Sequence, residues 1–185
     1  MKFLLANSIV LGLIIAGAAS LACAETIGAK VHILGRQYIQ VSTLSGSRVY
    51  ELNEDGINIQ VKQIRSISTE VAMTFIGDRL ALFRSVFETK RVDYPGQHSR
   101  VIECPSEYKP QFSEISGEEY YLAYFVGFAN QNKVAGACLP DLITYRYMYG
   151  FAYCKKRRQL FEIDHFSDLK VNAVPKFIET LSCDN

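Results

Sequence analysis

Residues 145–154 read YRYMYGFAYC, and this stretch decides the fold. An aromatic ring occupies every second position from Tyr145 to Tyr153. Period-two spacing predicts a β-strand, because successive side chains of a strand point to opposite faces of a sheet. The rings either form an exposed contact surface or fill the core of a chain that has no Trp. We favour burial, since half-buried strands select aromatic residues.

Further strands are predicted on both sides of this segment. Residues 120–128 fit a strand, although their periodicity fits a buried helix as well, and 160–163 fit a short strand. The N-terminal part is rich in β-branched residues and predicts strands at 30–34, 37–43, 49–52 and 57–64. Asp55-Gly56 predicts a tight hairpin turn before the last of these, because Gly accepts a positive φ.

Residues 69–88 predict one long helix. Its polar residues form a stripe, and apolar residues at helical spacing cover the other side: Ala72, Phe75, Ile76, Leu80, Phe83, Val86 and Phe87. Ser68 is a suitable N-cap. So wide an apolar face predicts that the helix packs on the sheet. Residues 89–118 predict a connection with one short strand at 100–103, and Pro175 predicts the start of a short final helix.

Together these elements predict an α+β fold, in which an antiparallel sheet carries one long packed helix and disulfides stabilise the second half. The length of 185 residues fits a single domain after an export signal. We expect that domain at 25–185. Strands and the helix occupy 25–90, and an aromatic-rich, cysteine-containing part occupies 91–185.

Residues 1–24 predict a secretory signal peptide. Lys2 precedes a mostly apolar run over 3–19, and Ala22-Cys23-Ala24 supplies a small-residue cleavage site before Glu25. An uncleaved anchor and a lipid on Cys23 are the alternatives. We expect the mature protein to be periplasmic or secreted, with no transmembrane span after cleavage.

Cleavage would leave four cysteines: Cys104, Cys138, Cys154 and Cys183. An even number in an oxidising compartment predicts two disulfides, and the lack of a C-x-x-C pair disfavours zinc. Three pairings can be drawn from four cysteines. The preferred one joins Cys138 to Cys154 and Cys104 to Cys183.

The sequence predicts no catalytic, cofactor-binding or metal-binding residue. His165 lies near Glu162, Asp164 and Asp168, but the spacing matches no known ligand motif. We interpret it as a surface histidine in an acidic turn. The formal net charge of +1 becomes zero when Lys2 is removed, which argues against nucleic acid as the main partner.

Two groups of residues form the candidate binding surface. One is the row of Tyr145, Tyr147 and Tyr149, if these rings are exposed. The other is a run of four cations that could contact anionic lipid, glycan or an acidic protein: Lys155, Lys156, Arg157 and Arg158. For the cations we favour a solvated turn, because the mature chain is neutral.

Three short segments resemble small periplasmic immunity proteins against type VI secretion amidases. They are Tyr124-Phe125-Val126-Gly127-Phe128, Cys138-Leu139-Pro140 and the terminal Cys183, and they cover about the last third of the chain. The resemblance implies a helical last third, whereas the periodicity predicts strands. It also implies a role in plugging a toxic enzyme.

The leading hypothesis is an exported, non-catalytic module that binds another protein or a cell-envelope component. One alternative is a periplasmic immunity-type inhibitor of a toxic envelope enzyme. The other is an envelope hydrolase that uses His165 and the nearby carboxylates. No cofactor is expected in the leading case.

Overall fold

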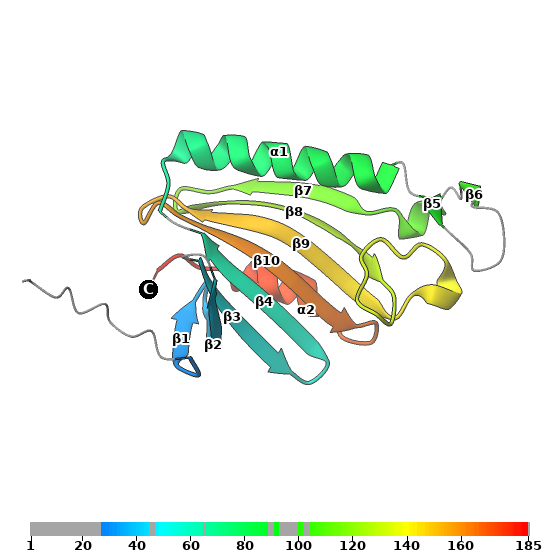
Figure 1. The fold of residues 1–185 in the computed structure, drawn as a ribbon, viewed down its shortest axis with the longest axis horizontal. Coiled ribbons are helices and arrows are strands. Elements are labelled where there is room, and N and C mark those ends of the chain that lie inside the picture. The colour runs from blue at the N-terminus through cyan, green and yellow to red at the C-terminus, as the bar shows by residue number, and fades with distance from the viewer. Residues whose placement is uncertain are drawn as a thin grey trace, which may run out of the picture.

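Eight antiparallel strands form one sheet in the order β1-β2-β3-β4-β10-β9-β8-β7 (Figure 1). The computed structural model describes residues 27–44, 47–64, 66–88, 91–92, 100–101 and 104–184. The strands of the sheet are β1 (Lys30–Ile33), β2 (Arg36–Leu44), β3 (Ser47–Glu54), β4 (Ile57–Ile64), β7 (Gln111–Ser116), β8 (Tyr120–Ala129), β9 (Tyr145–Cys154) and β10 (Gln159–Asp168). The predicted signal segment 1–24 lies outside the described residues.

Two α-helices pack on opposite faces of the sheet (Figure 1). The long helix α1 (Thr69–Glu88) and the short helix α2 (Ala173–Glu179) flank it. Two 3-10 turns, η1 (Ser106–Tyr108) and η2 (Pro140–Leu142), and a small separate sheet of β5 (Arg91–Val92) and β6 (Arg100–Val101) complete the described elements. The α+β prediction is confirmed, and so are the bounds of α1.

The side of the sheet that α1 covers is called the α1 face here. Ala72, Ile76 and Leu80 of the helix pack there against aromatic residues of β8 and β9. The Ser68 side chain caps the helix, because its Oγ accepts a hydrogen bond from the Val71 backbone N–H at 3.4 Å. The apolar face predicted from the sequence is therefore the side of the helix that packs on the sheet.

The opposite side, called the α2 face, holds the second part of the core. Phe177 of α2 is fully buried, in the same cluster as Tyr38 of β2 and Ile59 of β4. Because β-strand side chains alternate, Met148 of β9 lies on this face while its neighbours Tyr147 and Tyr149 lie on the α1 face. The burial predicted for the aromatic row is confirmed: Tyr147 and Tyr149 are each 5% exposed.

The structure resolves the ambiguity at 120–128. This segment lies in β8, which pairs with β7 on one side and β9 on the other. The helical last third that the immunity-protein resemblance implies is therefore wrong for this chain. The predicted strand at 160–163 belongs to the longer β10, and β7 was not predicted, because its sequence is mostly polar and follows Pro110.

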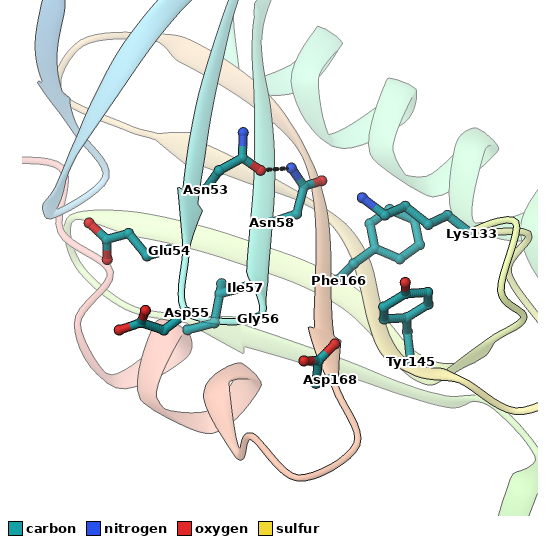
Figure 2. Close-up of a pocket in the computed structure, with 10 residues that line it drawn as sticks. All are labelled: Asn53, Glu54, Asp55, Gly56, Ile57, Asn58, Lys133, Tyr145, Phe166 and Asp168. Atoms are coloured by element: carbon teal, nitrogen blue, oxygen red, sulfur yellow. Dashed lines mark hydrogen bonds between the residues drawn. The ribbon is translucent and has the colours of Figure 1, made fainter.

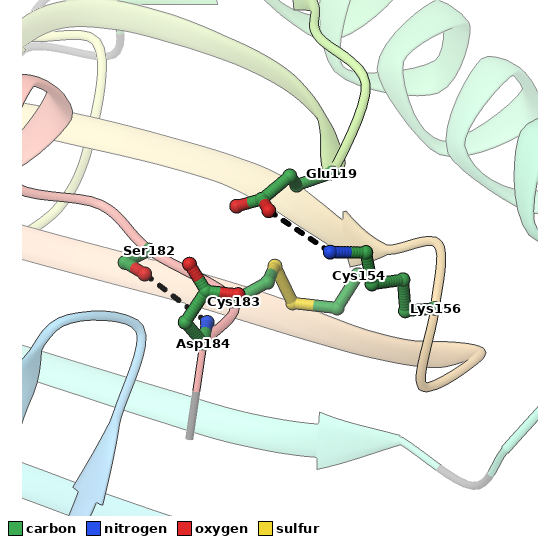
Figure 3. Close-up of a disulfide and its surroundings, with 6 residues drawn as sticks. All are labelled: Glu119, Cys154, Lys156, Ser182, Cys183 and Asp184. Carbon is green, nitrogen blue, oxygen red and sulfur yellow. Dashed lines mark hydrogen bonds and ion pairs between the residues drawn. A yellow bond between two sulfur atoms is a disulfide. The ribbon is translucent and has the colours of Figure 1, made fainter.

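The disulfides join Cys104 to Cys138 and Cys154 to Cys183. The preferred pairing of Cys138 with Cys154 is wrong. Cys138 precedes β9 and Cys154 ends it, and a ten-residue strand rises about 3.3 Å per residue, so the two lie far apart. Cys183 instead reaches Cys154 because α2 packs in the same cluster as Cys154, and the tail after α2 brings Cys183 to the end of β9 (Figure 3).

The two disulfides are typical of an oxidising environment outside the cytoplasm. In the described part of the chain, no helix combines the length and the apolar character needed to span a bilayer.

Candidate functional site

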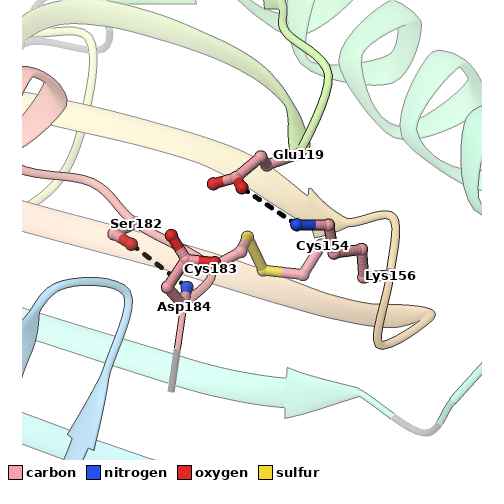
Figure 4. Close-up of polar contacts among 6 residues, drawn as sticks. All are labelled: Glu119, Cys154, Lys156, Ser182, Cys183 and Asp184. Carbon is pink, nitrogen blue, oxygen red and sulfur yellow. Dashed lines mark hydrogen bonds and ion pairs between the residues drawn. A yellow bond between two sulfur atoms is a disulfide. The ribbon is translucent and has the colours of Figure 1, made fainter.

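The cationic part of the predicted binding surface lies in the turn between β9 and β10. Lys155 Nζ donates a hydrogen bond to the Gly117 carbonyl at 2.5 Å, and Lys156 Nζ lies 3.1 Å from Glu119 Oε1 (Figure 4). Both contacts reach the turn between β7 and β8. The two lysines therefore tie neighbouring turns together, while Arg157 and Arg158 are exposed.

The aromatic part of that surface lies at the other end of β9 and inside the core. The Tyr149 ring packs 4.3 Å from Phe83 of α1, between ring centroids, so α1 covers it. Tyr147 and Tyr149 therefore cannot form an exposed contact surface, and only Tyr145 is half-buried. The expected single surface is two separate features about 30 Å apart, given the rise of a ten-residue strand.

His165 is fully buried, so its interpretation as a surface histidine is wrong. Its ring lies on the α2 face, 5.6 Å from the ring of Phe177. Neither ring nitrogen hydrogen-bonds to another described residue. Burial lowers the pKa of His165 to about 4, against a smaller opposing effect of its own backbone. The imidazole is therefore neutral at physiological pH.

The carboxylates near His165 in sequence point to the opposite face of the sheet. Asp164 Oδ1 accepts a hydrogen bond from the Tyr147 hydroxyl at 2.6 Å, and Glu162 Oε1 accepts one from Tyr149 at 2.7 Å. Both tyrosines belong to the α1 face. His165 and these carboxylates therefore do not meet, and the geometry expected of a histidine base oriented by a carboxylate is not formed.

The hydroxyls of Tyr147 and Tyr149 stay protonated beside these carboxylates. Burial, followed by the neighbouring carboxylates, raises the pKa of both Tyr147 and Tyr149. Burial also raises the pKa of Asp164, against the opposing hydrogen bond from Tyr147. Lys62 Nζ lies 3.5 Å from Glu162 Oε2 and partly compensates that charge. Both phenols therefore remain protonated donors, which hold the carboxylates in fixed positions.

A pocket of about 370 Å³ opens at the end of β10 on the same face (Figure 2). Four segments of the chain line it: the β3–β4 turn, the loop before β9, the start of β9 and the end of β10. Its lining residues are Asn53, Glu54, Asp55, Gly56, Ile57, Asn58, Lys133, Tyr145, Phe166 and Asp168. We call it the hairpin pocket.

The turn chemistry builds one wall of the hairpin pocket. Asp55 and Gly56 have φ angles of 33° and 78°, the positive values that a two-residue hairpin turn requires. The backbone N–H of Asp168 donates a hydrogen bond to the Gly56 carbonyl at 2.9 Å. A Cβ on Gly56 would lie 2.5 Å from Asp168 Oδ2, so a larger residue would have to displace that carboxylate as well as adopt the positive φ. The end of β10 is thereby held against the turn.

Aromatic rings build the other wall. The Phe166 ring centroid lies 6.4 Å from that of Tyr145 and 4.6 Å from that of Tyr147. Lys133 Nζ lies 5.4 Å from the Phe166 centroid, a cation–π distance. One aromatic face of the pocket thus already holds a positively charged group of the protein itself.

The lining charges of the hairpin pocket are unbalanced. Glu54, Asp55 and Asp168 carry carboxylates, and Lys133 carries an ammonium group. Asp168 lies on the side of the aromatic rings, whereas the side chains of Glu54 and Asp55 point away from Lys133 and the rings (Figure 2). Asn53 and Asn58, which hydrogen-bond to each other, add amide groups. A concave site with excess negative charge and aromatic faces suits a cationic group that carries hydrogen-bond donors.

Sequence reasoning identified the Asp55-Gly56 turn and Tyr145 but not this pocket. Its formation depends on the pairing of β4 with β10, which sets Asn58 opposite Phe166. No local signal encodes such a pairing between strands distant in the chain. In the described ranges, no three His, Cys, Asp or Glu residues gather as a group that could hold a metal ion.

No protein-family model matches the chain, and no curated protein matches it in sequence.

Proposed function

We propose that the protein is an exported, non-catalytic binding module that takes a positively charged group of another protein or of a cell-envelope component into the hairpin pocket. The observation that carries this proposal is the lining of the pocket of about 370 Å³: two aromatic rings beside the Asp168 carboxylate, with Glu54 and Asp55 at its edge. A guanidinium or ammonium group gains both ion pairing and ring contact in such a site.

The location in the periplasm or outside the cell is part of the same proposal. It rests on the predicted signal at 1–24 and agrees with the two disulfides. A partner in that compartment meets the protein in an oxidising solution, where the bridges persist. N-terminal sequencing of the exported chain checks the proposed start at Glu25.

An immunity-type inhibitor is a special form of this function, in which the cationic group belongs to a toxic envelope enzyme. The negative pocket is the feature that favours it over a lipid-binding role, because bacterial lipid surfaces are generally anionic and would be repelled. Purification of a stoichiometric complex with an enzyme would identify this form.

The test uses a charged probe and its neutral isostere. N-acetyl-arginine amide should bind the mature protein in a calorimetric or NMR titration, and N-acetyl-citrulline amide should bind at least about tenfold more weakly. Asp168→Asn and Phe166→Ala should each weaken binding of the arginine probe. Asp141→Asn, an exposed carboxylate outside the pocket, should leave it unchanged.

Lys133→Ala provides a test of opposite sign. Removing this ammonium group uncovers the face of the Phe166 ring and removes a positive charge that would repel the probe. The arginine probe should therefore bind more tightly. Equal binding of both probes, or weaker binding by Lys133→Ala, would contradict the proposed site.

A further inference from the structure

The strand β7 ends the sheet, and in the described part of the chain no strand pairs with its outer edge. Among the described residues, β7 pairs with β8 alone. The Gly117 N–H donates to the Tyr120 carbonyl at 3.0 Å and so marks a hydrogen-bonded pair at the turn. Bonded and non-bonded pairs alternate along an antiparallel ladder. Phe112, Glu114 and Ser116 therefore direct their N–H and C=O groups away from β8.

The two edges of the sheet differ in how well they are protected against pairing with a strand of another chain. The opposite edge, β1, has four residues and begins with Lys30, and both shortness and an edge lysine discourage pairing with another chain. β7 has six residues and contains neither lysine nor proline. Its exposed backbone groups are therefore the better template for an added strand.

The helix α1 leaves room beside this edge. An open groove of about 420 Å³ lies between α1 and the strands β7 and β8, and its lining includes Gly77, Arg84, Glu114 and Tyr121. A Cβ on Gly77 would meet no atom within 4 Å. The guanidinium of Arg84 lies over the Phe112 ring, 4.8 Å from its centroid. The edge thus carries a cation above Phe112 and an anion two residues later, at Glu114.

We propose that the β7 edge binds the β7 edge of a second copy of this chain, antiparallel and across a twofold axis at Ser113. In this register Phe112 of one copy stands opposite Glu114 of the other, and both belong to the outward-bonding set. Arg84, which lies over Phe112, then meets the partner's Glu114 on the same face. The axis repeats this ion pair, as an isologous interface requires.

Neighbouring registers lack this complementarity. An axis at Glu114 would place the two carboxylates opposite each other, and like charges directly opposite destabilise a sheet. An axis at Phe112 would bring the two Arg84 guanidinium groups together. The charge pattern therefore selects Ser113 as the centre and a second copy as the occupant.

The test is sedimentation equilibrium of the mature chain at micromolar concentrations. The wild type should be a dimer, and Glu114→Arg or Arg84→Glu alone should weaken dimerisation by about tenfold or more. The double charge swap, Glu114→Arg with Arg84→Glu, should restore the dimer. Glu118→Arg, in the exposed turn that follows β7, is the matched control and should remain dimeric.

A backbone variant separates strand pairing from charge. Glu114→Pro removes an N–H that points away from β8, which an edge strand tolerates, so the monomer should stay folded in a thermal melt but fail to dimerise. A monomeric wild type, a charge swap that does not restore the dimer, or a dimer that survives Glu114→Pro would each overturn the proposal.

Discussion

The carbonyl of Gly56 accepts a hydrogen bond of 2.9 Å from the backbone N–H of Asp168, which fixes the end of β10 against the β3–β4 turn. Gly56 also has a positive φ of 78°. The positive φ and the short distance to Asp168 therefore favour glycine at the point where the turn meets the end of β10.

Gly56→Ala should destabilise the protein by about 1–3 kcal/mol, because the new Cβ would both strain the backbone and displace the Asp168 carboxylate. Urea denaturation measures the loss. Gly28→Ala is the matched control, since Gly28 has a φ of 90° but open space around it. If the two losses are equal, the contact with Asp168 contributes nothing.

Stability should depend on pH through His165. Burial lowers its pKa in the folded state to about 4, below the ordinary value of 6.5, so the unfolded chain binds the proton first as pH falls. The free energy of unfolding should fall between about pH 6.5 and pH 4, by up to about 3 kcal/mol from this residue. Urea denaturation at several pH values over this range gives the free energy of unfolding as a function of pH. This free energy should change less steeply with pH for His165→Gln than for the wild type. An identical pH dependence would exclude His165 as the cause.

Each disulfide should stabilise the fold by a similar amount. The disulfides close loops of 34 and 29 residues, and in the chain-entropy treatment of a crosslink each raises the free energy of unfolding by about 3.5 kcal/mol. Serine pairs at Cys104 with Cys138, or at Cys154 with Cys183, should lower the denaturation midpoint accordingly. Non-reducing peptide maps should link the same partners, and a Cys138–Cys154 peptide would contradict the structure.

The Tyr147 hydroxyl should contribute to stability through Asp164. Tyr147→Phe removes the 2.6 Å hydrogen bond to a partly buried carboxylate, which should cost about 1.5–3 kcal/mol at neutral pH. The pKa of Asp164 should also rise further, because that hydrogen bond favours its charged form. Chemical denaturation and NMR titration of the carboxyl follow the two effects. Tyr108→Phe, whose ring packs on Phe128, is the control for loss of a hydroxyl alone.

Local patterns in the sequence were sufficient to predict most of the elements. The β-branched alternation of Ile57–Ile64 and the wide apolar face of Thr69–Glu88 give the strand and helix at those bounds. The edge strand β7 lacks such a pattern, because one side of it has no strand in the described sheet and its residues are largely polar.

Features that join distant segments could not be predicted in the same way. The face on which His165 lies follows from the pairing of β10 with β4 and β9, and without that register its acidic neighbours suggested a surface position. The disulfide partners depend likewise on where α2 returns the chain, since Cys154 and Cys138 lie at opposite ends of β9. The hairpin pocket depends on the first of these relationships, the pairing of β10 with β4 and β9.

The pairing of β4 with β10 also sets an order of events in folding. Val61 meets Ile163, roughly a hundred residues later in the chain, whereas the hairpins on each side of this junction close over short loops. We therefore expect the local hairpins to form before this junction, because closing the longer loop costs more conformational entropy. Until β10 pairs with it, β4 has one unpaired edge. Residues 159–168 consequently join the two halves of the sheet, β1–β4 and β7–β9.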